Sequence, residues 1–461
     1  MFKRIQRIHL VGVGGSGMSG IAEVLLNRGY RVSGSDLKLT SVTERLIERG
    51  ARIHGGHAPG HLDAADVVVV SSAVKPDNPE IEEARSRQIP IIPRAEMLAE
   101  LMRGKYGIAV AGTHGKTTTT SLVAGLTGHG GLDPTVVLGG RLNALGSNAK
   151  LGTGEFMVVE ADESDRSFLL LSPTLAVVTN IDQDHMESYA GMDDLKSTFA
   201  QFVNKVPFYG AAVLCRDDAA VASILPQIKR RVITYGFGQE SDLRVSAAEY
   251  SGYGSRFKLD FRDRSLGPFR LNLPGRHNVL NAAAAVAVGL DLGLAPSVMR
   301  SALAEFEGPD RRFQLKGRVG GITLIDDYGH HPTEIAATLH AAGHLRAKRL
   351  VVVFQPHRYS RTQYCFKEFS GAFDKADLVL LADIYAAGEE PIDGLTSDKL
   401  AQAIRQRGHR EARCLGAAED MAPRVAPLLE DGDLVLTMGA GSIARLADAL
   451  LMQLAEATPA K

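Results

Sequence analysis

Short β-branched runs alternate with helical patterns along the chain. Within residues 1–105 the pattern predicts strands at 8–13, 30–35 and 67–71 and helices at 16–28 and 95–102. Buried strands that alternate with crossover helices are typical of a parallel sheet. The first hundred residues therefore predict one doubly wound α/β unit.

The same alternation starts again near Tyr106 and once more near Gly308. In the second segment we expect antiparallel strands within 241–273, a loop at 112–116, helices at 117–126 and 278–290, and strands at 106–111, 156–160, 174–179 and 211–215. The third segment predicts helices at 332–342 and 442–450 and strands at 322–326, 349–354, 378–382 and 434–438. We expect an α/β protein of three domains, bounded at 1–105, 106–307 and 308–461, which also suits a chain of 461 residues.

Composition narrows the classes of function. A hydrophobic content of 45% is ordinary for a soluble protein, and a net charge of −1 gives no bulk attraction to nucleic acid or to anionic membranes. The three cysteines are far apart and form no CxxC pair, so a reducing cytoplasm is the simplest setting. The basic, apolar N-terminus is interrupted by His9 and a glycine cluster, and the longest uncharged apolar stretch, 168–181, is too short to span a bilayer. We expect a soluble cytoplasmic protein, a monomer or homodimer, with no nucleic-acid or membrane partner.

The first candidate binding loop runs from Gly12 to Gly17, after a predicted strand and before a predicted helix. Glycines at 12, 14 and 17 let the backbone approach a pyrophosphate on the helix N-terminus. Asp36 ends the next predicted strand, where a carboxylate can accept hydrogen bonds from a ribose. A nicotinamide dinucleotide, another nucleotide diphosphate and a turn without a ligand all remain open at this point.

The second candidate loop, in Ala111-Gly-Thr-His-Gly-Lys-Thr-Thr118, gives the stronger signal. It departs from the common P-loop pattern, because Val110 stands where the first glycine is expected and Gly112 is the first glycine. Its mechanics are retained, since backbone N–H groups can surround phosphates, Lys116 can reach the β and γ oxygens and Thr117 can bind Mg²⁺. The loop predicts ATP as the ligand.

Glu160 and His185 follow two predicted buried strands, in Glu160-Ala-Asp-Glu-Ser-Asp165 and Asn180-Ile-Asp-Gln-Asp-His185. The carboxyl ends of parallel strands face the ligand crevice, and a nucleotide triphosphate site needs ligands for magnesium. We therefore expect Glu160 and His185 to serve a metal site, with a solvated polar loop as the alternative.

Asn278 and Asn281 lie three residues apart at the start of the alanine-rich helix, where a nucleotide could be met. N-capping by Asn278 is the alternative. Arg311 and Arg312 follow the predicted boundary at Gly308 and could reach a phosphate from a neighbouring domain, although isolated arginines are more often solvated.

Two polar clusters end consecutive strands of the third segment, in Asp326-Asp-Tyr-Gly-His-His-Pro-Thr-Glu334 and Phe354-Gln-Pro-His-Arg-Tyr-Ser-Arg361. Such clusters face one cleft, and the pair Arg358 and Arg361 suits a substrate carboxylate. A metal site is the competing interpretation for the histidines, but the arginines would repel a cation.

These motifs together resemble the Mur ligase family of peptidoglycan synthesis, over nearly the whole chain. The motifs that carry the resemblance are GVGGSGMSGIA, SSAV, GTHGKTTTT, EADESD, NIDQDHMESY, GRHNVLNA, DDYGHHPTE and FQPHRYSRT. The resemblance implies a Rossmann-like N-terminal domain for the UDP part of UDP-N-acetylmuramate, a central P-loop ATPase domain with a mixed sheet, and a Rossmann-like α/β C-terminal domain for L-alanine. It implies a ligase that uses ATP and Mg²⁺ to convert the muramoyl carboxylate to an acyl phosphate, which the amine of L-alanine attacks.

The resemblance also implies roles for individual positions. The expected catalytic residues are Lys116, His185 and His330, with His330 as the candidate base. ATP is expected to contact Gly112, Thr113, His114, Gly115, Lys116, Thr117, Thr118, Asn278, Asn281, Arg312 and Asp327. The UDP-sugar is expected to contact Gly12, Gly14, Gly15, Ser16, Gly17, Asp36, Ser71 and Ser72. Magnesium is assigned to Thr117, Glu160 and His185, and the alanine end to Tyr328, His330, Arg358 and Arg361. One departure is the loop 439–442, where Ser442 stands in place of an expected acid.

Three alternatives define the tests of this interpretation. Within the family, a ligase that attaches a recycled tripeptide to the same sugar nucleotide would need a larger amino-acid end. A nicotinamide-dependent oxidoreductase would rest on the first glycine loop and Asp36, but the second phosphate loop argues against it. A P-loop switch would hydrolyse ATP without regard to any amino acid.

Overall fold

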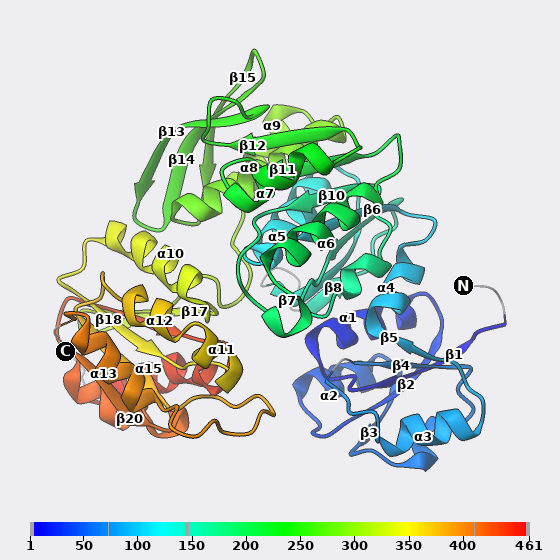
Figure 1. Ribbon diagram of the computed structural model, residues 1–461, viewed down its shortest axis with the longest axis horizontal. Coiled ribbons are helices and arrows are strands. Elements are labelled where there is room, and N and C mark those ends of the chain that lie inside the picture. Colours follow the sequence, from blue (N-terminus) through cyan, green and yellow to red (C-terminus); the bar gives the residue numbers. More distant parts are fainter. Residues whose placement is uncertain (1–3, 72, 143–146, 410, 458–461) are drawn as a thin grey trace. The chain divides into compact units, whose positions relative to one another are not determined.

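The computed structural model describes residues 4–71, 73–142, 147–409 and 411–457, which form three sheets (Figure 1). The chain forms two compact units. One consists of Met1–Ser246, Lys258–Phe269 and Leu280–Pro309, and the other of Ala247–Phe257, Arg270–Val279 and Asp310–Lys461. The prediction of an α/β fold with a mixed central sheet is confirmed.

The first sheet has the order β3-β2-β1-β4-β5, and its strands pair in parallel. Its strands are β1 (Arg7–Val11), β2 (Arg31–Asp36), β3 (Arg52–Gly55), β4 (Val67–Val70) and β5 (Ile91–Pro93), and its helices are α1 (Ser16–Asn27), α2 (Ser41–Glu48), η1 (Pro59–Leu62), α3 (Pro79–Ser86) and α4 (Arg94–Met102). Figure 1 shows α1 and α4 on one face and α3 on the other. Side chains alternate along β1, so Leu10 packs with α1 and α4 while Val11 packs with η1 and α3. The strand order reverses between β1 and β4, and the loops after them meet there.

The second sheet has the order β15-β14-β13-β12-β11-β10-β6-β9-β7-β8. Its strands are β6 (Tyr106–Ala111), β7 (Thr135–Leu142), β8 (Ser147–Lys150), β9 (Phe156–Glu160), β10 (Leu175–Val178), β11 (Ala211–Cys215), β12 (Val232–Gly236), β13 (Leu243–Ser251), β14 (Gly254–Phe261) and β15 (Arg264–Leu271). In this spatial order, every neighbouring pair between β13 and β7 is parallel, and β8 is antiparallel to β7. Loops of two residues join β13, β14 and β15, which only antiparallel neighbours allow.

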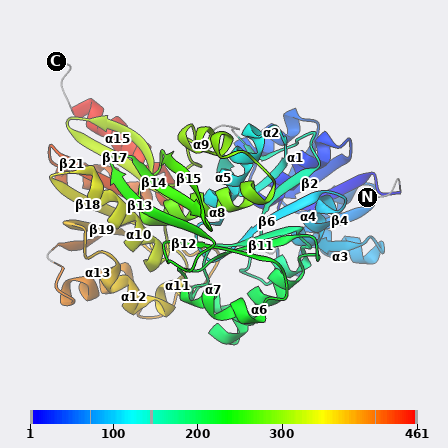
Figure 2. The ribbon, with the colours of Figure 1, turned by 90° about the horizontal axis from the view of Figure 1, so that it is seen from above.

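Helices cover both faces of this second sheet. Figure 2 shows α5 (Lys116–His129), α8 (Arg276–Asp291) and α9 (Pro296–Ala304) above it, with α6 (Met192–Asn204) and α7 (Ala219–Ile224) below. Short 3₁₀ turns are η3 (Ser167–Leu170), η4 (Met186–Ser188) and η5 (Leu225–Gln227). Because α8 begins at Arg276, Asn278 lies inside the helix and is not its N-cap, so that alternative is wrong.

The third sheet has the order β16-β17-β21-β18-β19-β20, parallel except for β16. Its strands are β16 (Gln314–Val319), β17 (Ile322–Asp327), β18 (Arg349–Phe354), β19 (Leu378–Ala382), β20 (Ala412–Gly416) and β21 (Asp433–Met438). Its helices are α10 (Pro332–Ala342), η6 (Gly343–Leu345), α11 (Tyr359–Tyr364), α12 (Phe366–Ala372), α13 (Ser397–Gln406), η7 (Ala418–Asp420), α14 (Ala422–Val425), η8 (Ala426–Leu428), η9 (Ser442–Arg445) and α15 (Leu446–Ala457). Val352 packs with α10, α12 and α13, whereas Val353 packs with α14 and α15. The predicted helix 442–450 is therefore a 3₁₀ turn followed by a longer α-helix.

The carboxyl ends of the parallel strands carry the candidate loops. Residues 112–117 follow β6, Glu160 ends β9, and the segment 179–185 follows β10. Within the described ranges, every helix is too short or too polar to cross a lipid bilayer.

Candidate functional site

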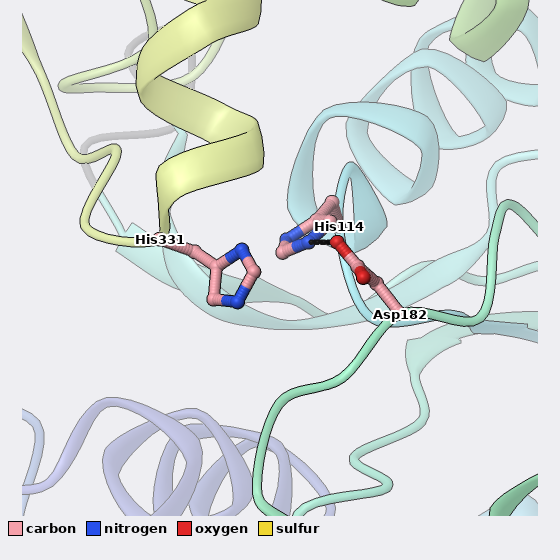
Figure 3. A group of neighbouring side chains, drawn as sticks. All are labelled: His114, Asp182 and His331. Atoms are coloured by element: carbon pink, nitrogen blue, oxygen red, sulfur yellow. Dashed lines mark hydrogen bonds and ion pairs between the residues drawn. The ribbon is translucent and has the colours of Figure 1, made fainter. Parts of the chain in front are cut away.

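The loop after β6 is hydrogen-bonded along its length to the segment after β10. Asn180 accepts from two backbone N–H groups of the loop, those of Thr113 at its carbonyl (3.1 Å) and His114 at Oδ1 (2.8 Å). The ring Nε2 of His114 lies 2.9 Å from Oδ2 of Asp182 (Figure 3). The hydroxyl of Thr113 in turn accepts from the Asp182 N–H at 2.8 Å. The NIDQDH motif therefore shapes the phosphate-type loop.

Two glycines of this loop stand where no other residue fits. Gly112 has φ +134°, and a Cβ there would lie 2.0 Å from Oγ1 of Thr179. Gly115 is left-handed at φ +79° and directly precedes α5, and its Cβ would lie 2.7 Å from Oδ1 of Asn281. A loop so close to its neighbours presents backbone N–H groups and the N-terminus of α5, the arrangement that binds phosphate.

Lys116 is the first residue of α5 and points back over the loop. Its Nζ donates to the carbonyls of Gly112 (2.7 Å) and Thr113 (3.0 Å) and lies 2.8 Å from Oε2 of Glu163. Burial alone would lower the pKa of Lys116, but the carboxylates of Glu163, Asp162 and Glu160 outweigh it and raise this pKa. Lys116 is therefore a fixed ammonium beside the loop.

Thr117 and Glu160 lie side by side. The Thr117 hydroxyl donates to Oε2 of Glu160 at 3.0 Å, and the same oxygen accepts the N–H of Gly139 at 2.9 Å. A hydroxyl and a carboxylate are hard oxygen donors of the kind Mg²⁺ prefers. His185, left-handed at φ +55°, lies 3.7 Å from the carboxylates of both Asp184 and Glu187.

In the first loop, Gly12, Gly14 and Gly17 each lie against a different side chain. A Cβ at Gly12 would lie 3.2 Å from Cβ of Ser71, and Gly14 donates its N–H to Oδ2 of Asp36 at 2.9 Å. Gly15 directly precedes α1, which starts at Ser16. Asp36 therefore stabilises the loop itself. Ser72 lies outside the described residues.

Gly17 allows the approach of an arginine that the sequence did not single out. A Cβ at Gly17 would lie 3.0 Å from Nη1 of Arg94, the first residue of α4. Arg94 lines a cavity of about 290 Å³ together with Val70, Ser71, Ile91, Ile92, Pro93, Ala95, Asp165 and Ser167. The cavity joins the carboxyl ends of β4 and β5 to the loop after β9.

The asparagines of α8 have different surroundings. Asn281, 6% exposed, lies against Gly115, as described above. Asn278 is buried, and its Nδ2 donates to the carbonyl of Pro274 at 2.8 Å, within the compact unit that holds the third sheet.

In the unit that holds the third sheet, the carboxylate of Asp327 is hydrogen-bonded to backbone N–H groups. Its carboxylate accepts the N–H groups of Phe313 and Gly329, both at 2.8 Å, and burial raises the pKa of Asp327. Arg312 lies 3.8 Å from Glu334 and 4.9 Å from the ring centre of Tyr328. Asp327 thus holds the turn that presents Arg312 and Tyr328.

The remaining predicted residues of this unit form a row of rings and cations. The ring of His330 lies 5.3 Å from that of Tyr328 and 5.8 Å from that of His357. Arg361, 7% exposed, lies 3.3 Å from Nδ1 of His357. Arg358 is left-handed at φ +69° and directly precedes α11. The row brings Tyr328, His330 and Arg361 into one neighbourhood.

The loop 439–442 packs against the end of β18. Oε1 of Gln355 accepts the N–H of Ile443 at 3.0 Å, and Ser442 lies 3.2 Å from Nε2 of the same glutamine. Gly439 is at φ +138°, and a Cβ there would lie 2.8 Å from the carbonyl of Gln355. The loop therefore supports the segment that carries His357 and Arg358.

Four residues of the site were missed from the sequence: Arg94, Glu163, Asn180 and Asp182. The motifs that contain the last three were recognised, but only their first or last residue was predicted to act. The available signal was the polarity of the whole loops, since each buried polar side chain in them needs a partner.

Three domain models of the Mur ligase family match the chain in order. They are described as Mur ligase family, catalytic domain (residues 7–106), Mur ligase middle domain (110–289) and Mur ligase, glutamate ligase domain (311–441).

Full-length relatives share more than half of the residues. The UDP-N-acetylmuramate--L-alanine ligase of Geotalea daltonii is 54% identical over 457 residues, which cover 99% of this chain and 100% of the relative. The ligase of the same name from Anaeromyxobacter dehalogenans is 56% identical over 448 residues, covering 97% and 98%.

Solved structures show the same fold. The UDP-N-acetylmuramate-alanine ligase of Thermotoga maritima matches with a TM-score of 0.83 at 29% identity, over 98% of this chain and 100% of that chain. A murein peptide ligase from Psychrobacter arcticus matches with a TM-score of 0.74 at 25% identity, over 99% and 100%.

Proposed function

The chain belongs to the Mur ligase family, and on this premise we propose that it is an ATP-dependent ligase that joins L-alanine to the carboxylate of UDP-N-acetylmuramate. The product is the first amino-acid adduct of a peptidoglycan precursor. The observation that carries this proposal is the likeness, over the full length, to ligases named for this reaction.

The alanine ligase is favoured over the tripeptide-recycling ligase by the degree of likeness. Two curated alanine ligases are 54% and 56% identical to the chain. Among the solved structures, an alanine ligase matches at 29% identity with a TM-score of 0.83, and a murein peptide ligase at 25% identity with a TM-score of 0.74. A nicotinamide oxidoreductase would leave the second phosphate loop unexplained.

We assign the sugar nucleotide to the first loop and to the cavity beside it. The first-turn N–H groups of α1 and the glycines 12, 14, 15 and 17 suit a diphosphate, as does the guanidinium of Arg94. Ser71 lines the same cavity, and Asp36 stands beside the loop. These contacts support the roles that the family resemblance gives to Ser71 and Asp36.

We assign ATP to the second loop. Gly112–Thr118 surround the phosphates, Lys116 pairs with the β and γ oxygens, and Asn281 lies beside the loop. Asn278, Arg312 and Asp327 are proposed for the rest of the nucleotide.

Thr117, Glu160 and His185 would hold Mg²⁺, and the contact between the Thr117 hydroxyl and the Glu160 carboxylate supports this donor set. When bound, the metal supplies positive charge against the phosphate oxygens. The protein's own part is to orient these oxygens and to exclude water from them.

The chemistry follows from the weak electrophilicity of a carboxylate. A muramoyl carboxylate oxygen attacks the γ-phosphorus of ATP, the bond to the β-bridging oxygen breaks, and ADP leaves. The neutral amine of L-alanine then attacks the acyl carbon of the acyl phosphate. The tetrahedral intermediate expels phosphate, and the amine loses its proton. Lys116 and the N-terminus of α5 stabilise charge that develops on the transferred phosphoryl group.

The amino acid is assigned to the third sheet. Arg358 and Arg361 suit the carboxylate of L-alanine, Tyr328 borders it, and His330 is the candidate base that takes the proton of the amine. We also propose the domain limits 1–105, 106–307 and 308–461, a cytoplasmic setting, and a monomer or homodimer.

Phosphate release, measured with ATP, Mg²⁺ and UDP-N-acetylmuramate while the amino acid is varied, tests the proposal. L-alanine should stimulate release strongly, and mass spectrometry should find the alanyl product. Stimulation by the tripeptide alone would favour the recycling ligase, and release that no amino acid changes would favour a P-loop switch. Consumption of NADH or NADPH would favour the oxidoreductase.

A further inference from the structure

Asp162 and Glu163 are neighbours in the loop after β9, and their carboxylates face different cations. Oδ2 of Asp162 lies 3.4 Å from Nη2 of Arg94, whereas Oε2 of Glu163 lies 2.8 Å from Nζ of Lys116. Arg94 lies against the first glycine loop and Lys116 belongs to the second. Two consecutive residues thus contact the cations of both proposed nucleotide sites.

The loop that carries this pair is fixed at its backbone. The Tyr189 hydroxyl and the N–H of Arg166 (3.0 Å) both donate to the carbonyl of Glu163. The carbonyl of Asp162 accepts the N–H of Phe168 at 3.2 Å. Phe168 of η3 packs in the same apolar core as α4, the helix that carries Arg94. The backbone that carries the two carboxylates is therefore held in place by these contacts.

The two pairs differ in exposure, and this sets the size of each effect. The side chain of Glu163 is 2% exposed and that of Lys116 15%, whereas Asp162 is 41% and Arg94 19% exposed. Hydrogen bonds to a buried charged group contribute more than ion pairs open to solvent. Losing the Glu163 carboxylate should therefore cost more than losing that of Asp162.

An ammonium has three N–H bonds, and here the acceptors are two loop carbonyls and Glu163. Since both carbonyls belong to the loop itself, Glu163 is the contact that ties Lys116 to a different strand end. It limits the directions in which the side chain can present its ammonium, and a bound phosphate would share or replace one of these three acceptors.

We propose that Asp162 and Glu163 are positioning residues with divided tasks, Asp162 orienting Arg94 for the sugar nucleotide and Glu163 orienting Lys116 for the phosphates of ATP. This inference rests on the assignment of the two loops to UDP-N-acetylmuramate and ATP. Neither residue needs to touch a substrate in order to act.

The test measures two affinities separately by calorimetry, that of UDP-N-acetylmuramate and that of the non-hydrolysable analogue AMP-PNP with Mg²⁺. Glu163→Ala should weaken AMP-PNP binding about tenfold or more and leave the sugar nucleotide within about twofold. Asp162→Ala should weaken UDP-N-acetylmuramate about threefold and leave AMP-PNP within about twofold. Glu163→Gln and Asp162→Asn keep an oxygen acceptor and should restore most of each loss.

Glu155→Gln is the matched control, because it removes an exposed carboxylate beside the opposite end of β9 and should change neither affinity. Equal weakening of both ligands by either alanine variant would indicate a general structural role and overturn the proposal. Unchanged or tighter AMP-PNP binding in Glu163→Ala would also overturn it. Binding of the two ligands to the unaltered protein reports on the loop assignments separately, so a failure of the proposed function is seen independently.

Discussion

At the scale of single residues, Gly112 is the most constrained position of the phosphate-type loop. Any other residue would meet both an unfavourable φ of +134° and the hydroxyl of Thr179 at 2.0 Å. Gly131, at φ +75°, has nothing within 4 Å of a Cβ and serves as the control. Gly131→Ala should lower the free energy of unfolding by about 1 kcal/mol, from backbone strain alone. Gly112→Ala should lower the free energy of unfolding by about 3 kcal/mol or more, because the clash adds to the strain, and should abolish ATP binding. Urea denaturation curves measure the free energy of unfolding of both variants. Equal losses in the two variants would contradict the predicted clash.

Lys116→Ala tests the electrostatic role of the lysine. Removing one such donor to a developing charge typically lowers kcat about 10²–10³-fold. The variant should still bind UDP-N-acetylmuramate, because that ligand is assigned to the other loop. Lys150→Ala, which removes a half-exposed lysine paired with Asp133, should keep normal turnover. Near-normal phosphate release by Lys116→Ala would refute the assignment.

The sequence predicted some members of the site and not others, for a physical reason. Lys116 and Thr117 occupy positions set by the strand–loop–helix geometry, so their roles follow from spacing. Glu163 and Asp182 lie in loops rich in acids, and the direction of each side chain depends on turns such as the left-handed Arg166 at φ +63°. Spacing along the chain does not determine such turns.

At the scale of elements, the start of α3 depends on one buried carboxylate. Glu80 is fully buried and accepts from the Ser35 hydroxyl at 2.5 Å, and it lies 2.8 Å from Nδ1 of His61 and 3.4 Å from Nε2 of His9. Burial raises the pKa of Glu80, but these hydrogen bonds outweigh it and lower the pKa to about 2.

The sign of the resulting pH dependence follows from linkage. The folded-state pKa of Glu80 is below its unfolded value of about 4.3, so the contribution to stability is complete above about pH 5 and is lost as the pH falls towards 2. The shift corresponds to about 3 kcal/mol. The difference in unfolding free energy between the unaltered protein and Glu80→Gln should therefore shrink across this range. Glu82→Gln, on the exposed side of α3, should show no such trend; a constant difference for Glu80→Gln would contradict the prediction.

Strands were predicted best where a continuous apolar run marks them, and most of those at sheet edges were missed. The predicted bounds of β6, β9, β11, β18 and β19 agree with the structure, because continuous β-branched or apolar runs mark them. The strands β3, β5, β7, β8, β12, β16 and β20 were not predicted. Of these, β3, β5, β8, β16 and β20 are three to six residues long and end a sheet, so their strand conformation comes from pairing with a neighbour, whereas β7 and β12 lie inside the second sheet.

At the scale of the whole molecule, the first sheet and much of the second share one apolar core. Leu10 of β1, Leu98 of α4, Phe168 of η3 and Val178 of β10 belong to the same cluster, whereas the third sheet has clusters of its own. A shared core predicts a shared cooperative opening.

Hydrogen exchange at increasing urea measures this cooperativity. Amides of β1 and β10 should report the same opening free energy, and UDP-N-acetylmuramate at 100 times its Kd should raise both by about 2.7 kcal/mol. Amides of β18 provide the comparison within the third sheet. Opening of β1 at a much lower free energy than β10 would show that the common cluster does not act as one core.

The packing of α4 on η3 also determines where this chain can be recombined with a relative. A hybrid joined at residue 105 would bring α4 from one parent onto η3 from the other, so side chains that evolved separately would meet in the interior. A hybrid joined near Pro309 keeps both partners from the same parent, although it divides the second compact unit, which also includes residues 247–257 and 270–279. The contact between α4 and η3 therefore survives exchange of the third sheet and not exchange of the first, although the first is the shorter segment.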